Sequence, residues 1–191
     1  RSWLDNLQHR VEWLRTWCPG VPHSPLPPCY PMALLVSPRD FLACVLQGSA
    51  RKRAADGIGL EMLEFEHEVM SHLEDAAKVA APGEGVYVSG LHLRGASWGK
   101  ETDQLEEAPE TSDFTAMPMI HFVPTVRDAD AVQRLERCYA CPVYKTSLPR
   151  GLGPAMPGQP SDEVCTVSLR AGPEPLVWVL RRAALVCDVE E

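Results

Sequence analysis

Cys141-Pro-Val-Tyr-Lys-Thr-Ser147 is the stretch that says most about the fold of this chain. Two other stretches are best considered with it, Gly85-Val-Tyr-Val-Ser-Gly-Leu-His-Leu-Arg-Gly95 upstream and Trp178-Val-Leu-Arg-Arg-Ala-Ala-Leu-Val-Cys187 downstream. All three are rich in apolar, β-branched or aromatic residues, which favour strands. We therefore predict strands over residues 85–94, 141–147 and 176–187.

Further strands are predicted between and before these stretches. Residues 63–69 alternate between larger apolar or aromatic side chains and glutamates, which is the two-residue period of a half-buried strand. Residues 119–123 and 164–169 are further candidates. Residues 100–113, which are acidic and polar, and residues 148–160, which are rich in proline and glycine, are predicted surface loops. Short strands joined by such loops are typical of a small antiparallel barrel or sandwich.

Two helices are predicted in the first part of the sequence. Apolar residues recur every three or four positions from Trp3 to Cys18, which indicates one face of an amphipathic helix that ends at Pro19-Gly20. The second helix begins after Ser37, a predicted N-cap, and runs to about Arg53. The proline-rich stretch between the helices is predicted to be an extended connector without regular hydrogen bonds.

These elements predict an α+β fold. Helices and the proline-rich connector occupy residues 1–60, and a small antiparallel β-barrel occupies residues 61–191. A chain of 191 residues with 45% hydrophobic content can bury a core. Its 18 Lys and Arg against 26 Asp and Glu give a net charge of −8, which disfavours nucleic acid and acidic membrane surfaces as partners.

Cysteine usage and the first residues suggest where the protein resides. The 7 irregularly spaced cysteines do not form the framework of a small secreted domain, so cytosolic thiols are the better interpretation. No apolar run approaches the roughly 20 residues that a membrane span needs. The sequence begins Arg1-Ser-Trp-Leu, without an initiator Met or a leader, which predicts a piece of a longer polypeptide.

Three motifs resemble known binding motifs, but each lacks a residue or a spacing that the chemistry requires. The segment from Gly95 to Glu101 has three residues between its glycines where a P-loop has four, and a Glu where a P-loop has Ser or Thr, so nucleotide binding is not predicted. His67 and His72 are five positions apart and cannot face one metal, which predicts a partly buried His67 and a surface His72. Cys138 and Cys141 have the spacing of half a zinc site, but no second close pair exists, and structural thiols are favoured.

In order and composition, the three stretches resemble the C-terminal domain of dynein heavy chains. That family has a Y-x-C-P-V-Y-K-T block between a G-V-Y-V-x-G-L-x-L-x-G-A-x-W block and a final W-x-x-R-x-A-L-L-C strand. The counterparts here begin at Tyr139, Gly85 and Trp178. The opening tryptophan-rich helix and shorter blocks extend the resemblance over nearly the whole sequence. Residues 31–40 and 149–161 replace an aromatic-rich run and an S-T-T-G run of the family, which marks a divergent member.

The resemblance implies a non-catalytic segment of a microtubule-based motor. It would pack on the AAA+ ring of the same polypeptide and modulate the motor, with other dynein subunits as indirect partners. No catalytic, cofactor-binding or metal-binding residue is predicted in it, and no cofactor. The implied location is the cytoplasm and its cytoskeleton; the sequence alone does not distinguish axonemal from cytoplasmic service, and its divergence favours the axoneme of a cilium or flagellum. The side chains expected to build the core are Trp3, Trp13, Trp17, Tyr87, Trp98, Cys141, Tyr144 and Trp178.

Two alternatives remain open at this point. The first is a free-standing β-barrel module that binds a peptide or protein partner, which a stable monomer without a large exposed apolar patch would favour. The second is a small thiol–metal domain built on Cys138 and Cys141, which bound zinc lost on Cys138→Ser would support.

Overall fold

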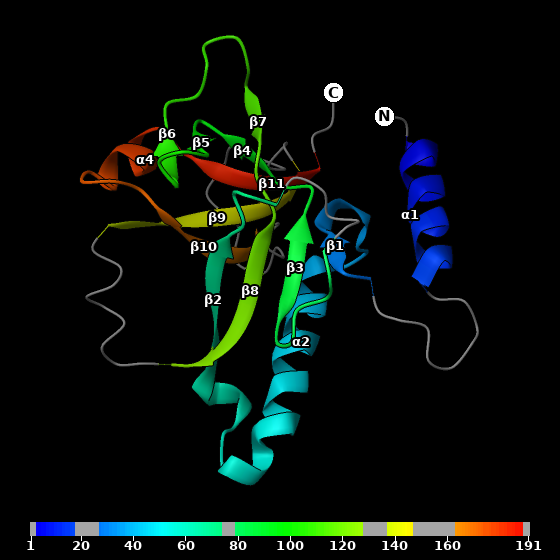
Figure 1. Ribbon diagram of the computed structural model, residues 1–191. Coiled ribbons are helices and arrows are strands. Elements are labelled where there is room, and N and C mark those ends of the chain that lie inside the picture. Colours follow the sequence, from blue (N-terminus) through cyan, green and yellow to red (C-terminus); the bar gives the residue numbers. More distant parts are fainter. Residues whose placement is uncertain (1–2, 18–26, 74–78, 128–136, 147–162, 189–191) are drawn as a thin grey trace, which may run out of the picture.

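A computed structural model describes residues 3–17, 27–73, 79–127, 137–146 and 163–188 (Figure 1). Helices and strands alternate irregularly along these residues, and strands predominate. Within the described ranges no helix is both long enough and apolar enough to cross a membrane.

The helices lie mostly in the first part of the sequence. They are α1 (Trp3–Trp17), α2 (Pro38–Arg53), the short α4 (Leu176–Leu180) and the 3-10 turns η1 (Met32–Leu34), η2 (Ala54–Asp56) and η3 (Leu60–Met62). The two predicted helices are therefore confirmed. The Ser37 hydroxyl accepts a hydrogen bond from the Asp40 amide at 3.4 Å and caps α2 as predicted.

The strands form two larger sheets and one hairpin. The four-stranded sheet has the order β1 (Cys29–Pro31), β3 (Val86–Ser89), β8 (Ile120–Val126), β2 (Leu63–Val69). The five-stranded sheet has the order β10 (Glu163–Arg170), β9 (Cys138–Thr146), β11 (Ala184–Asp188), β4 (His92–Arg94), β7 (Phe114–Ala116). The hairpin pairs β5 (Ser97–Gly99) with β6 (Gln104–Glu106).

This topology confirms the α+β class and corrects the predicted barrel. Both larger sheets are open, because the described strands at their two edges do not pair with each other. The sheets are also mixed, since β1 runs parallel to β3 and β11 runs parallel to β9. In Figure 1 the strands of the four-stranded sheet run steeply up the view, whereas β9, β10 and β11 run across its upper part.

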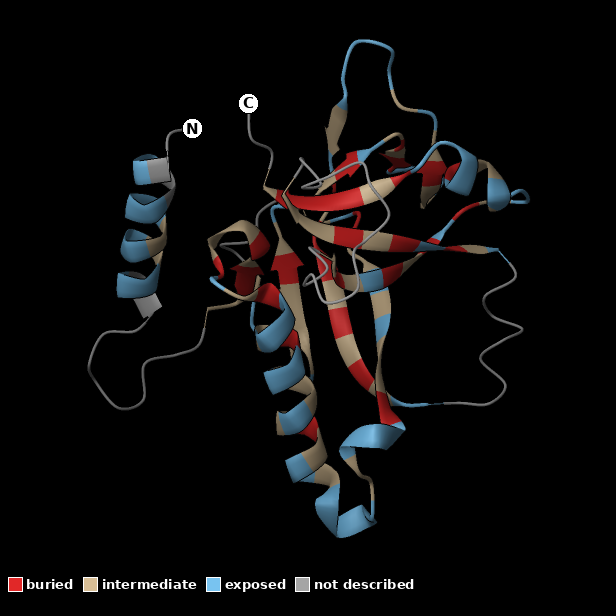
Figure 2. Cartoon of the chain, turned by 180° about the vertical axis from the view of Figure 1, so that it is seen from behind, coloured by how far each residue is buried: buried red, intermediate tan, exposed pale blue. Residues whose placement is uncertain are grey.

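One hydrophobic core joins the layers. Helix α2 covers one face of the four-stranded sheet, where it contacts β2 and β8 and buries Leu42 (Figure 2). Phe122 in β8, Val143 in β9 and Leu185 in β11 are fully buried in the same cluster. Met32 from η1 belongs to the same cluster, so the two predicted regions, 1–60 and 61–191, share one core. The boundary between these regions stays a prediction.

Several predicted segments differ from the structure. The proline-rich connector contains β1 and η1, because the Cys29 to Pro31 backbone can extend alongside β3 despite the nearby prolines. The strand predicted over residues 85–94 is two strands, β3 and β4, in different sheets. Gly90 separates them with a φ of 73°, which turns the backbone from one sheet to the other.

Two further segments were assigned wrongly. The predicted loop 100–113 contains β6, whose Leu105 is buried in the core. The strand predicted over residues 176–187 begins as α4 and only then becomes β11, because the amides of Val177 and Trp178 bond back to Glu174 and Pro175. The predicted loop 148–160 lies outside the described residues.

Candidate functional site

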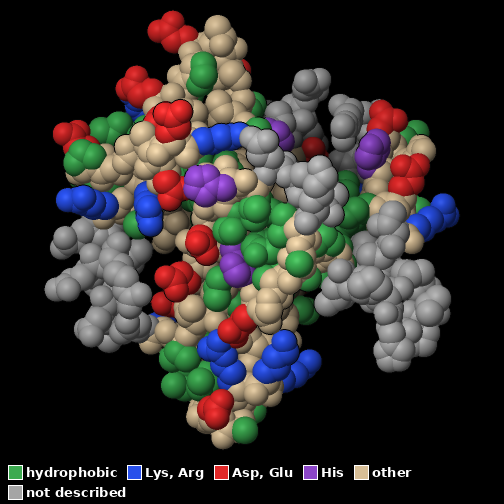
Figure 3. Space-filling view, viewed as in Figure 1, with side chains coloured by type: hydrophobic (Ala, Val, Ile, Leu, Met, Phe, Trp, Pro, Cys, Tyr) green, Lys and Arg blue, Asp and Glu red, His purple; other side chains and the backbone are tan. Residues whose placement is uncertain are grey.

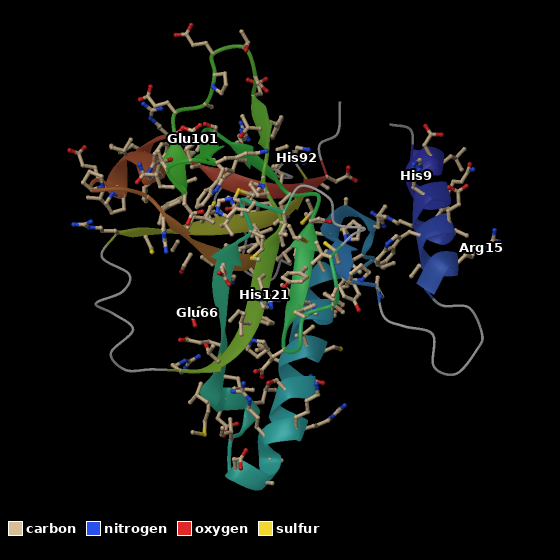
Figure 4. All side chains as sticks on the ribbon, viewed as in Figure 1. His9, Arg15, Glu66, His92, Glu101 and His121 are labelled. Carbon is tan, nitrogen blue, oxygen red and sulfur yellow. The ribbon has the colours of Figure 1, made fainter. Side chains whose placement is uncertain are left out.

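The segment that superficially resembles a P-loop is a structural turn and hairpin. Gly95 has a φ of 72°, and a Cβ at this position would lie 2.8 Å from the Arg181 carbonyl oxygen. The glycine therefore lets the β4–β5 turn pack closely on the segment before β11. Glu101 is exposed at the β5–β6 turn (Figure 4), where its carboxylate would repel phosphate.

The two histidines of the metal-like motif lie in different environments. His67 is half-buried in β2, with its ring centroid 4.7 Å from that of Phe122. Its Nδ1 accepts a hydrogen bond from the Ser168 amide of β10 at 3.5 Å, so the imidazole bridges the edges of the two sheets. Burial lowers the pKa of His67 to about 4. His72 is exposed, as predicted.

The cysteine pair sits on one strand. Cys138 is half-buried and Cys141 is fully buried in β9. Burial raises the pKa of Cys141 to about 12, and it does the same for Cys165 and Cys187. Such thiols stay protonated at neutral pH, whereas metals bind the thiolate. Among the described residues, no group of three or more His, Cys, Asp and Glu side chains could hold a metal ion.

Trp98 anchors a hydrogen-bond network that the sequence did not predict. Its indole Nε1 donates to the buried Ser71 hydroxyl at 2.9 Å, and Ser71 donates to Asp103 Oδ1 at 2.9 Å. Arg170 of β10 completes the network with a hydrogen bond of 3.0 Å to Asp103 Oδ2. The network ties the hairpin to the end of β2 and to the five-stranded sheet. No sequence pattern signals it, because its members come from three separate segments: the hairpin, the end of β2 and β10.

Trp178 fixes the only short helix between β10 and β11 in the described residues. Its ring is buried, its Nε1 donates to the Ala171 carbonyl at 3.1 Å, and the Arg181 guanidinium lies 5.7 Å from the ring centroid. Tyr139 donates its hydroxyl proton to the Ala183 carbonyl at 2.6 Å. These contacts hold α4 against β9, and they explain why an apolar run can be helical here.

The other predicted core aromatics lie nearer the surface. Tyr87 and Tyr144 are half-buried, and the Tyr87 ring centroid is 4.7 Å from that of His121. Trp13 is half-buried in α1, 6.3 Å from the Tyr30 ring in edge-on geometry. Trp3 and Trp17 belong to α1, but their side chains lie outside the described residues.

Large apolar side chains are exposed at three main places, which makes an interaction surface the best candidate for a functional site. They lie along α1, around α4, and at the tip where η3 meets the end of β8. The hydrophobic side chains at the tip can be seen at the lower end of the molecule in Figure 3. The residues are Leu4, Leu7, Val11 and Leu14 in α1, Leu176, Val179 and Leu180 in α4, and Leu60, Met62 and Val126 at the tip.

Comparison with known proteins agrees with the sequence blocks. A family model described as the C-terminal domain of the dynein heavy chain matches residues 1–187. Dynein axonemal heavy chain 5 of Mus musculus is 32% identical over 189 residues, which cover 98% of this chain and 4% of the relative. The dynein-1-beta heavy chain of the flagellar inner arm I1 complex of Chlamydomonas reinhardtii is 31% identical over 188 residues, with coverage of 98% and 4%. The chain thus spans a small part of the relatives it matches.

Proposed function

The chain belongs to the family of C-terminal domains of dynein heavy chains, and from that premise we propose that it packs on the AAA+ ring of its own heavy chain and modulates the motor without catalysing a reaction itself. The observation that carries the proposal is the match over residues 1–187 to this one family. The covered 4% of each relative leaves ample polypeptide for ATPase modules elsewhere.

The proposal has a physical requirement. A segment that touches the ring can bias it only if its contacts differ in free energy between nucleotide states of the ring. The exposed apolar faces of α1 and α4 support the proposal, because they offer contact surface that the described core does not use. We further propose service in a cilium or flagellum, since the relatives compared above are named as axonemal or flagellar chains.

The test compares motors with and without a folded segment. We would purify the natural heavy chain, a version that lacks residues 1–187, and the core variant Phe122→Ala, and measure microtubule-activated ATPase and gliding velocity. Glu110→Gln in the exposed acidic loop is the control for a substitution without a structural effect. We expect the truncation and Phe122→Ala to change the coupling between ATPase and velocity, and the control to match the natural protein. Identical ATPase and velocity in all four would refute the modulatory role.

A simpler measurement separates the proposal from the alternative of a free-standing interaction module. An antibody against residues 100–113 reports the size of the natural polypeptide. A single very large band is expected for a heavy chain. A band near 21.1 kDa, the mass of these 191 residues, would refute the proposal and favour the independent module.

A further inference from the structure

A cleft lies at the end of the four-stranded sheet where β2 and β3 end and β8 begins (Figure 1). Its walls come from the turn after β2, the end of β3, the turn between β5 and β6, and the segment that joins β7 to β8. The cleft has a volume of about 280 Å³. This volume has room for about nine groups of the size of a water molecule or a methylene, so it fits a small molecule.

Most of the wall of the cleft is apolar. Met117 and Met119 line it and are buried, and Leu73 and Pro118 are half-buried beside them. Methionine side chains are flexible and polarisable, so they can adapt to an apolar ligand. The wall therefore suits a hydrocarbon group.

One lining hydroxyl is already fixed by the fold. Ser71 donates its only hydroxyl proton to Asp103 Oδ1 and accepts a hydrogen bond from Trp98 Nε1, both at 2.9 Å. Ser71 therefore holds its part of the wall in place, and it has no proton to donate to a ligand.

Two other polar groups at the cleft are hydrogen-bond donors. Lys100 is exposed at the β5–β6 turn and brings an ammonium group, and Ser89 brings a hydroxyl from the end of β3. Lys100 carries the only charge among the described residues that line the cleft, in a chain whose net charge is −8. The cleft thus differs in sign from the chain as a whole, and it favours a ligand with one negative charge.

We propose that the cleft binds a free carboxylic acid with an unbranched hydrocarbon tail of about eight carbons. The carboxylate accepts hydrogen bonds from Lys100 Nζ and the Ser89 hydroxyl, and the tail packs on Met117 and Met119. This site goes beyond the proposed function, because it requires no contact with the AAA+ ring.

The number of charges distinguishes this ligand from two others. A phosphate group carries up to two negative charges, which one ammonium and one hydroxyl do not balance. A lipid bilayer is held by clusters of basic residues, whereas Lys100 is alone among the described lining residues. A monocarboxylate matches the single ammonium group.

Photo-labelling of the intact heavy chain tests the proposal. The probe is octanoic acid that carries a diazirine, and peptide mass spectrometry locates the label after irradiation. We expect the label in residues 71–73 or 116–119, and we expect octanoate to compete for it. Octylamine, which has the same tail and the opposite charge, and acetate, which lacks the tail, should not compete. Labelling mainly in α1 or α4, or equal competition by octylamine, would overturn the inference.

Two substitutions test the lining residues. Lys100→Met keeps the aliphatic stem and removes the charge, so half-maximal competition should need about threefold more octanoate. Lys52→Met, at an exposed position on α2, is the matched control and should behave as the natural protein does. Ala116→Phe places a ring at the exposed rim of the cleft, where it should fill the cleft and abolish labelling. Equal competition in Lys100→Met and Lys52→Met would refute a carboxylate site.

Hydrogen exchange gives a second measurement that does not depend on photochemistry. The ligand would touch both the β5–β6 turn and the segment before β8, so it should link the hairpin to the four-stranded sheet. Octanoate at ten times its half-maximal concentration should slow exchange in residues 97–106 and 117–123 by about tenfold, and exchange in α1 should not change. Unchanged exchange in both of these segments would contradict the proposal.

Discussion

Acid should destabilise the fold through His67, the imidazole that lies between the two larger sheets. Its Nδ1 accepts the Ser168 amide at 3.5 Å, and its ring packs against Phe122. A protonated imidazole cannot accept this hydrogen bond, and its charge would lie in apolar surroundings. Protonation therefore acts directly on the contact between β2 and β10.

The sign and size of the effect follow from the pKa of His67. Burial lowers this pKa from 6.5 to about 4, so the unfolded protein binds the proton first as the pH falls. The contribution of His67 to stability is complete above its unfolded pKa and decreases as the pH falls from 6.5 towards 4. At about pH 5 the loss in free energy of unfolding is about 2 kcal/mol.

Urea unfolding measures this loss. The free energies of unfolding of the natural protein and of His67→Gln are compared at about pH 7.5 and about pH 5. Gln keeps an acceptor for the Ser168 amide and does not titrate, so His67→Gln should lose about 2 kcal/mol less than the natural protein over this interval. His72→Gln, at an exposed position, is the control and should behave as the natural protein does. If His67→Gln loses as much stability as the natural protein, the reasoning is wrong.

Three more predictions follow from the burial of single side chains. Leu185→Ala should lower the free energy of unfolding by about 3 kcal/mol because Leu185 is fully buried. Leu180→Ala, at an exposed position, should change it by less than about 0.5 kcal/mol. Urea unfolding of the two variants measures this difference. Tyr139→Phe should cost about 1–2 kcal/mol, because a buried carbonyl loses its donor, and a thermal midpoint equal to that of the natural protein would contradict this. A maleimide should modify the exposed Cys44 in the folded protein and Cys141 only after unfolding, as peptide mass spectrometry can measure.

The elements that could be predicted from sequence are those with local determinants. Ser37, Pro38 and Asp40 specify the start of α2 within four consecutive residues, and the structure has the helix start there. The alternation in β2 likewise depends only on neighbouring residues, and it places His67 between the sheets. Local chemistry was sufficient in both cases.

The errors arose where tertiary contacts decide the outcome. A short apolar run can be a strand or a buried helix, and periodicity alone does not distinguish them. Around Trp178 the hydrogen bond to the Ala171 carbonyl, which comes from the neighbouring β10 segment, selects the helix. Strand pairing is equally non-local, so the sequence predicted the strands near residues 120 and 164 but not the two open sheets that contain them.

The sequence predicted the helix that carries part of the candidate interaction surface, but not which of its side chains are exposed. The periodicity of α1 identified an amphipathic helix, but it could not tell which side the fold would use. Trp13 and Arg10 make that choice through Tyr30 and Ala33, which lie in the proline-rich connector after α1. The exposed apolar side chains of α1 can therefore be identified only once the helix is placed.

The central position of β11 has a consequence for biosynthesis. It is the last described strand along the sequence, yet it lies between β9 and β4 in the five-stranded sheet. A ribosome therefore delivers both halves of the sheet before the strand that joins them. Until Ala184 to Asp188 emerge, the facing edges of β9 and β4 lack their partner and can pair with other polypeptides. The five-stranded sheet can therefore be completed only after Ala184 to Asp188 have been translated.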